Sequence, residues 1–303
     1  MRKPPGAGDD SIGPVSGTVA ALALFSALLS AAATIFIRQG LRGYGPYTGV
    51  WINMAVGTVC LWIAVLFTGG LGQPTPTALA LFVLAGLIGT VAGRVLRFFA
   101  IEAVGASITG AFMNVTPLVS SGLAILFLGE HVTIPIVLGT LVIVAGATLL
   151  STGGRSLGVR PVQLWLPILS ATCFGIVAIL RKLGLSGMAP VPGTAVNVTT
   201  ALVVFTGFLL ASGQRGAMIC RGRSLLYFLA AGVTENLGVF LVVLALSVGT
   251  VSVVAPLTNV TPLFVIVFSL LFLRGIETLN ARVIGGSALI VVGACLITAL
   301  GGR

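Results

Sequence analysis

The chain has few charged residues, a single histidine and only two lysines. Charged residues make up 7% of its 303 residues, whereas soluble domains carry about 25%. One histidine, His131, cannot supply the two histidines of a zincin H-E-x-x-H site. Neither Lys3 nor Lys182 lies in a G-x-x-x-x-G-K-[ST] phosphate loop. The sequence therefore argues against histidine-based metal catalysis and against ATP hydrolysis by that loop, and we predict no cofactor and no metal site.

Apolar residues dominate instead. They account for 57% of the chain, and the mean hydropathy is +1.17. A helix that crosses a bilayer needs roughly 20 apolar residues. Windows of about that length, bounded by glycine, proline or basic residues, fall at 17–37, 47–68, 77–98, 104–128, 132–152, 163–181, 194–212, 224–247, 250–273 and 283–300. We predict an all-α integral membrane protein with ten transmembrane helices, no soluble domain and no enzymatic activity.

Basic residues outnumber acidic ones by 16 to 6. They are scattered between apolar stretches, which is typical of loops that anchor a membrane protein and not of a nucleic-acid surface. We therefore expect the lipid bilayer, and no nucleic acid, as a partner. Eleven arginines fall on one predicted face, and five basic residues, among them Arg181 and Lys182, fall on the face that holds the termini. The positive-inside rule then favours termini outside the cell, in its inner (plasma) membrane.

The sequence repeats itself. A shift of 144 residues aligns serines, prolines and asparagines, namely Ser26 with Ser170, Pro46 with Pro190 and Asn53 with Asn197. A shift of 145 aligns residues 114–118, Asn-Val-Thr-Pro-Leu, with residues 259–263 letter for letter. Chance matches between apolar helices would pair leucine and valine instead. We predict two copies of a five-helix unit, at 17–152 and 163–300, with a linker at 153–162 and a polar tail at 1–16.

An odd number of helices in each unit carries the second unit into the bilayer from the opposite side. Inverted repeats of this kind place a ligand site near the membrane midplane, where the two halves rock to give alternating access. We therefore expect one central cavity that both units line.

Ionisable side chains inside the windows are expected to face this interior, because inserting each one at the bilayer centre costs about 2.5 to 3.5 kcal/mol. Glu235 lies near the middle of the eighth window, beside Asn236. Arg94 lies in the third window, which the repeat equates with the eighth, so a long side chain there can reach inward; an anchor at the membrane surface is the alternative for Arg94 as well. For Arg97 the simpler interpretation is an anchor at the membrane surface. For Glu235 a structural ion pair is the alternative to binding substrate or a proton.

Two asparagines form the strongest paired polar signal, Asn114 in the fourth window and Asn259 in the ninth. Each precedes a proline, Pro117 or Pro262, that removes a helical hydrogen bond near mid-membrane. Pro256 adds a second break in the ninth window only. These prolines predict kinks that line the cavity or act as hinges, and packing kinks without a ligand role are the alternative.

Small polar residues complete the candidate substrate-binding set. Ser26 and Ser30 share one face of the first window, and Ser170 occupies the matching place in the sixth. Small residues serve helix packing as readily as ligand binding, so both interpretations stay open. Gly89 and Gly93, at G-x-x-x-G spacing in the third window, predict a close contact between helices.

A family pattern follows from these motifs. Phe-Phe-Ala-Ile-Glu-Ala-Val-Gly-Ala-Ser at 98–107, Asn-Val-Thr-Pro at 114–117 and Leu-Gly-Glu at 128–130 resemble the EamA module of the drug/metabolite transporter superfamily. The second unit resembles it more loosely, since Arg-Gly-Ile-Glu at 274–277 departs from the compact Gly-Glu. The resemblance implies a ten-helix transporter with one central cavity. Bacterial members of the family include exporters of amino acids, among them an aromatic amino-acid exporter.

The resulting hypothesis is a secondary transporter that exports small amphiphilic metabolites such as aromatic or hydrophobic amino acids. Opposite charges on Arg94 and Glu235 would offer a partner for each end of a zwitterion. A proton-coupled exporter of cationic drugs is the first alternative, and a lipid-modifying membrane enzyme or a passive channel belong to other classes. A small-molecule substrate is the expected soluble partner, and the chain is expected to be a monomer or a weak homo-oligomer.

Overall fold

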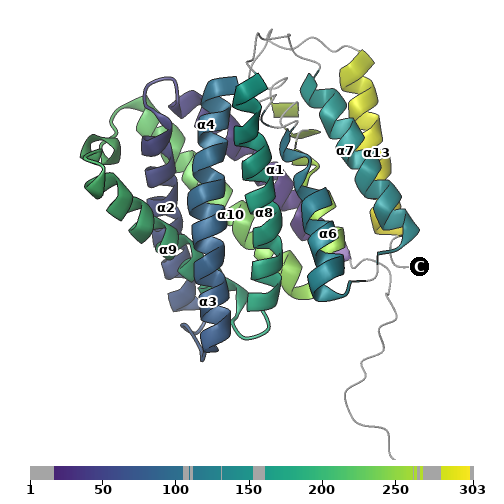
Figure 1. Ribbon diagram of the computed structural model, residues 1–303, viewed down its shortest axis with the longest axis horizontal. Coiled ribbons are helices and arrows are strands. Elements are labelled where there is room, and N and C mark those ends of the chain that lie inside the picture. The colour runs from purple at the N-terminus through teal and green to yellow at the C-terminus, as the bar shows by residue number, and fades with distance from the viewer. Residues whose placement is uncertain are drawn as a thin grey trace, which may run out of the picture.

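The computed structural model describes residues 17–104, 109, 112–130, 132–152, 161–261, 263–264, 267–268 and 281–300, and every regular element among them is helical (Figure 1). The first half contains α1 (Gly17–Gly40), α2 (Pro46–Phe67), α3 (Pro76–Ala85), η1 (Gly86–Gly93), α4 (Arg94–Val104), α6 (Thr116–Leu128) and α7 (Ile134–Thr152). The second half contains η2 (Pro161–Leu164), α8 (Trp165–Gly184), α9 (Pro190–Ala211), η3 (Arg215–Met218), α10 (Arg223–Val248), α11 (Val251–Thr258) and α13 (Ala281–Leu300).

Within the described ranges, six helices are long and apolar enough to cross a membrane. They are Gly17–Gly40, Pro46–Phe67, Pro76–Val104, Trp165–Gly184, Pro190–Ala211 and Arg223–Val248. Their outward faces carry large apolar side chains, and Phe67, for example, is 85% exposed. Soluble monomers rarely show such extended apolar surfaces, which in a bilayer contact lipid tails. These features are those of a multi-pass membrane protein.

The third span is longer than the sequence predicted. We expected one helix over 77–98 and the next from 104 onward, but α3, η1 and α4 form one span from Pro76 to Val104. Its middle part, η1, is a π-helical segment. Gly89 lies so close to α8 that a Cβ there would come 2.6 Å from Val177, and one at Gly93 would come 3.2 Å from Cys173. The predicted close helix contact at these glycines is confirmed.

The fourth and ninth windows contain breaks where the sequence predicted kinked helices. Asn114 lies in a turn, and α6 begins only at Thr116, with Pro117 in its first turn. A proline there forfeits no helical hydrogen bond, which explains why the helix starts at this point. In the ninth window α11 ends at Thr258 with Pro256 inside it, and Asn259 follows in a turn. Pro262 lies outside the described residues.

The two repeats interlock through their third helices. A phenylalanine of each repeat's third helix packs on glycines from the first two helices of the other repeat. The contacts are Phe82 with Gly184 and Gly193, and Phe228 with Gly40 and Gly49. A Cβ on any of these glycines would lie less than 3.0 Å from the ring. Because the glycines match at a shift of 144 residues and the phenylalanines at 146, the duplication is visible in the packing as well as in the sequence.

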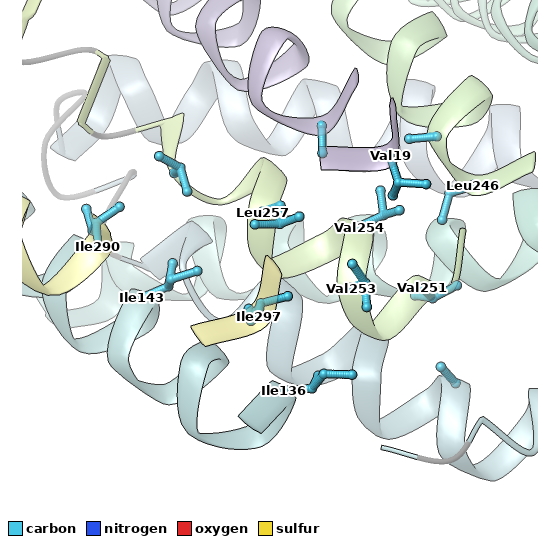
Figure 2. Packing of buried hydrophobic residues seen from close by; sticks show 14 of the residues in the cluster. Val19, Ile136, Ile143, Leu246, Val251, Val253, Val254, Leu257, Ile290 and Ile297 are labelled. Carbon is cyan, nitrogen blue, oxygen red and sulfur yellow. The ribbon is translucent and has the colours of Figure 1, made fainter. Parts of the chain in front are cut away.

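A large apolar cluster packs α1, α7, α10, α11 and α13 together (Figure 2). Val19 of α1 and Leu246 of α10 meet the α11 residues Val251, Val254 and Leu257 there, and Ile143 of α7 and Ile290 of α13 extend the same cluster. α7 and α13 lie side by side at one edge of the molecule (Figure 1). This packing leaves the polar side chains of α2, α4, α9 and α10 inside the bundle.

Candidate functional site

A buried group of charged and amide side chains joins α2, α4 and α10. We call it the Asn53 cluster, and it comprises Asn53, Arg94, Arg97, Glu235 and Asn236. Asn53 Nδ2 donates to Glu235 Oε2 at 2.9 Å, and Arg94 Nη1 donates to Asn53 Oδ1 at 2.6 Å. Arg97 Nη1 pairs with Glu235 Oε1 at 2.6 Å, while Arg94 Nε lies 3.8 Å from the same oxygen. Of the two interpretations of Arg94, the structure has the inward one, with the guanidinium close to Glu235.

Arg97 differs from its prediction. We expected an anchor at the membrane surface, but its side chain is only 15% exposed and bonds Glu235. Its Nη2 also donates to Thr34 Oγ1 of α1 at 2.9 Å. Residues three apart share a helix face, so Arg97 follows Arg94 into the interior. The surface-anchor prediction is wrong because the span continues to Val104 and leaves Arg97 well inside it.

Asn53 was missing from the predicted site, although it connects most of the cluster. Asn236 Nδ2 donates to the Asn53 carbonyl at 2.9 Å and to its Oδ1 at 3.1 Å. The sequence held a signal for this residue, because Asn53 and Asn197 match in the repeat and both lie in otherwise apolar windows. A repeated amide inside two membrane helices requires hydrogen-bond partners. Arg94 and Glu235 provide them for Asn53.

A second polar group occupies the equivalent place in the other repeat. We call it the Asn197 cluster, and it comprises Asn197 of α9, Thr90 of η1 and Arg181 of α8. Thr90 Oγ1 donates to Asn197 Oδ1 at 2.8 Å. Thr90 precedes Asn236 by 146 residues, the shift that also relates Phe82 to Phe228. The Thr90–Asn197 contact is therefore the counterpart of the contact between Asn236 and Asn53.

The two clusters differ in charge. Arg181 is 7% exposed and makes one long contact, from Nη2 to Asn197 Oδ1 at 3.5 Å. No carboxylate within the described residues lies within 4.0 Å of it. The position that corresponds to Glu235 is Gly89, and Val177 packs against it. We expected Arg181 among the loop residues on the side of the termini, and this prediction is wrong, since its guanidinium lies inside the bundle.

The two paired asparagines do meet. Asn259 Nδ2 donates to Asn114 Oδ1 at 3.1 Å, which joins the breaks of the fourth and ninth windows. Asn114 is 1% exposed, and its own Nδ2 has no hydrogen-bond partner among the residues that the structure describes. An unpaired amide N–H inside a protein costs free energy, so this group is available to a ligand or a water molecule. Ligand binding by Asn114 and Asn259 stays a prediction.

The predicted serines lie at helix contacts. Ser170 is buried, and its Oγ donates to the Gly93 carbonyl at 2.8 Å. Ser26 and Ser30 face Gly238 of α10, where an added Cβ would be 3.4 Å from the Ser26 carbonyl oxygen and from Ser30 Oγ. All three therefore contribute to close packing between helices, and their ligand role stays a prediction.

Two charged residues hold helix ends together near α11. Both carboxylate oxygens of Glu130 accept backbone N–H groups, from Val251 at 2.9 Å and from Ser252 at 3.0 Å. Lys182 Nζ donates to the carbonyls of Leu246 at 2.8 Å and Gly249 at 2.7 Å. An anion at a helix N-terminus and a cation at a C-terminus both stabilise the helix dipole. Lys182, which we expected in a loop, thus caps α10.

The polar clusters are nearly closed to solvent in this conformation, with Arg94 1% and Glu235 4% exposed. A shallow groove of about 270 Å³ lies on the outer face of α2, and its lining is apolar from Ala55 to Cys60. It lacks the polar groups of a substrate site. Cys60, Cys173, Cys220 and Cys295, all among the described residues, form no disulfide.

Comparison with known proteins places these features in context. A model of the EamA-like transporter family matches residues 17–152 and 162–299. No curated protein matches the chain. A solved crystal structure superposes on the chain with a TM-score of 0.75 at 19% identity, covering 93% of this chain and 97% of that one. At this level of identity the likeness shows a shared fold.

Proposed function

The chain belongs to the EamA-like transporter family, and on that basis we propose that it is a secondary transporter with its substrate site between the two repeats. The proposed substrates are small amphiphilic metabolites such as aromatic or hydrophobic amino acids, and the proposed direction is export across the inner membrane. Transport would proceed by alternating access, without a cofactor and without hydrolysis.

We propose ten crossings in two units of opposite orientation. The end of α1 lies near the start of α10, because Arg221 N donates to Tyr44 Oη at 3.1 Å. The end of α8 lies near the end of α10, where Lys182 bonds the Leu246 and Gly249 carbonyls. The equivalent helices α1 and α8 thus finish at opposite ends of α10. This arrangement supports inverted repeats, which alternating access uses in other transporters.

The observation that carries the substrate proposal is the buried ion pair between the repeats. Arg97 comes from the first unit and Glu235 from the second, and Asn53 bonds the same carboxylate. A zwitterion offers a carboxylate to the arginine and an ammonium to the glutamate, so it can replace this pair when the halves separate. The cationic-drug alternative receives less support, because both Glu235 oxygens already accept hydrogen bonds and two arginines lie close by.

The exposed basic residues favour termini outside the cell. Five exposed arginines lie at the end of the bundle where α1 finishes and α10 begins, namely Arg38, Arg42, Arg215, Arg221 and Arg223. Five basic residues are expected at the opposite end; Arg181 and Lys182 lie inside the bundle or cap a helix, and the other three lie outside the described residues. The positive-inside rule then places the arginine-rich end in the cytoplasm.

Reconstitution tests the proposed function. Proteoliposomes preloaded with L-phenylalanine should take up labelled L-phenylalanine by exchange, above protein-free vesicles. Glu235→Gln should lower this exchange about tenfold or more, because the substrate ammonium and Arg97 both lose their anionic partner. Glu102→Gln, at an exposed glutamate of α4, is the matched control and should leave exchange unchanged. No exchange of phenylalanine, tryptophan or leucine would refute the substrate proposal.

A further inference from the structure

The Asn197 cluster contains a buried positive charge that no described residue neutralises. Arg181 makes a single contact at 3.5 Å, the outer limit of a hydrogen bond, and its Nε has no partner. Its neighbour Lys182 is already engaged at the end of α10. Arg94 lies within electrostatic range of Arg181 and contributes charge of the same sign.

An arginine in this position is costly without an anion. Guanidinium groups stay protonated in proteins, so Arg181 cannot escape the cost by losing its charge. Burying an unpaired charge is unfavourable, whereas the same charge paired and hydrogen-bonded is tolerated. Across the two clusters the interior holds three arginines, at 94, 97 and 181, and one acid, Glu235. The chain therefore lacks two negative charges there among its described residues.

The repeat identifies the position at which an acid of the chain itself would neutralise the Asn197 cluster. Glu235 serves the Asn53 cluster from the third helix of the second unit, and its counterpart in the first unit is Gly89. Val177, one helical turn before Arg181, packs directly on this glycine. The corresponding residue of the first unit, Ala33, is smaller. The Asn197 cluster thus has neither an acid nor the space for one. Arg181 therefore remains available to an anion from another molecule.

We propose that Arg181, supported by Asn197 and Thr90, binds the anionic group of the transported molecule, so that the substrate is a carboxylic acid or a zwitterion and not a cation. The guanidinium presents a planar fork of N–H donors that matches a carboxylate. Among the described residues Asn197 Nδ2 donates to the Phe82 carbonyl alone, at 3.5 Å, which leaves its second N–H available to the same ligand. This inference rests on the proposed transport function and specifies the substrate charge.

Three probes of one shape and different charge test the inference. They are 3-phenylpropionate, L-phenylalanine and 2-phenylethylamine, titrated onto the full-length protein in phosphatidylcholine nanodiscs, which supply no anionic headgroup. The rise in melting temperature reports binding. We expect the acid and the amino acid to bind and the amine not to bind. Arg181→Gln should weaken binding of the acid about 10- to 100-fold, the loss of a charged hydrogen-bond pair.

Arg38→Gln, at an exposed arginine, is the charge-matched control and should bind all probes as the unaltered protein does. Arg181→Lys keeps the charge without the fork and should retain part of the affinity, which guards against misfolding of the glutamine variant. Equal binding of the amine and the acid to the unaltered protein would overturn the inference. So would full affinity of Arg181→Gln for the acid.

If none of the three phenyl probes binds, the result counts against the proposed substrate class. A second measurement then tests the anion site by itself. Acetate and inorganic phosphate, at fixed ionic strength, should then stabilise the unaltered protein more than Arg181→Gln. Equal stabilisation of both proteins would overturn the anion site itself. The titration is then repeated in nanodiscs that contain phosphatidylglycerol. If this lipid alone abolishes the response to acid and phosphate, the anion is a lipid headgroup. That result would also overturn the inference that the substrate supplies the anion.

Discussion

The Asn53 and Asn197 clusters occupy equivalent places in the two repeats but differ in their charges. In the first, Asn53 bonds both Arg94 and Glu235, and Arg97 pairs directly with Glu235 across the interface between the units. In the second, Asn197 contacts Thr90 and an arginine without an acid. Each repeat nevertheless packs a phenylalanine of its third helix on two glycines of the other repeat. The duplication has preserved these ring contacts and has let the charged groups diverge.

This difference predicts how each cluster responds to substitution and to an added anion. The Asn53 cluster contains opposite charges whose bonds connect the two units, so its removal should change stability strongly. The Asn197 cluster contains one charge sign, so it should gain from an added anion and should contribute little stability alone. Substitutions in the two clusters should therefore have effects of opposite sign.

The largest effect is expected at Glu235. Glu235→Gln leaves Arg94 and Arg97 without an anion inside the bundle and should lower the free energy of unfolding by about 3 to 5 kcal/mol. Unfolding of the detergent-solubilised protein in increasing SDS measures this change. Glu102→Gln, an identical change at an exposed position, should have almost no effect. Similar losses in both variants would show that the Asn53 cluster does not stabilise the interface.

The phenylalanine contacts should be equivalent in the two repeats. Phe82→Ala and Phe228→Ala each empty the space over two glycines and should each cost about 3 kcal/mol in the same assay. Phe67→Ala, at a side chain that is 85% exposed, is the control and should cost much less. A loss in one repeat only would mean that the packing, and not just the charge, has diverged.

The smallest effect, and one of opposite sign, is expected at Arg181. Arg181→Gln removes an unpaired buried charge and should raise the free energy of unfolding by about 1 kcal/mol in the absence of ligand. Arg97→Gln removes a paired charge and should lower it. Arg38→Gln at an exposed site should be neutral. A destabilised Arg181→Gln variant would indicate that Arg181 already has a stabilising partner.

The sequence predicted much of this architecture because the signals were repeated. Matching asparagines, prolines and glycines located the two units, and Glu235 was identified as interior since a charge at mid-membrane is costly. The contact between Asn114 and Asn259 also follows the repeat. Composition and spacing suffice for such features, because they depend on helix period and membrane depth.

Other features depend on tertiary context that one sequence does not reveal. Arg97 was assigned to the surface because the π-helical segment and the full length of the third span could not be foreseen. Arg181 and Lys182 together resemble a loop at a helix end, yet one lies inside the bundle and the other caps α10. Long side chains can reach inward or outward from the same backbone position, and only the neighbouring helices decide which.

The most direct measurement introduces the missing acid into the second cluster. Gly89→Glu combined with Val177→Ala introduces next to Arg181 the residues that stand at the equivalent positions beside the Asn53 cluster, Glu235 and Ala33. Binding of 3-phenylpropionate to this double variant should be lost, and its melting temperature without ligand should exceed that of Val177→Ala alone. Unchanged binding of the acid together with an unchanged melting temperature would contradict a free anion-binding arginine between the repeats.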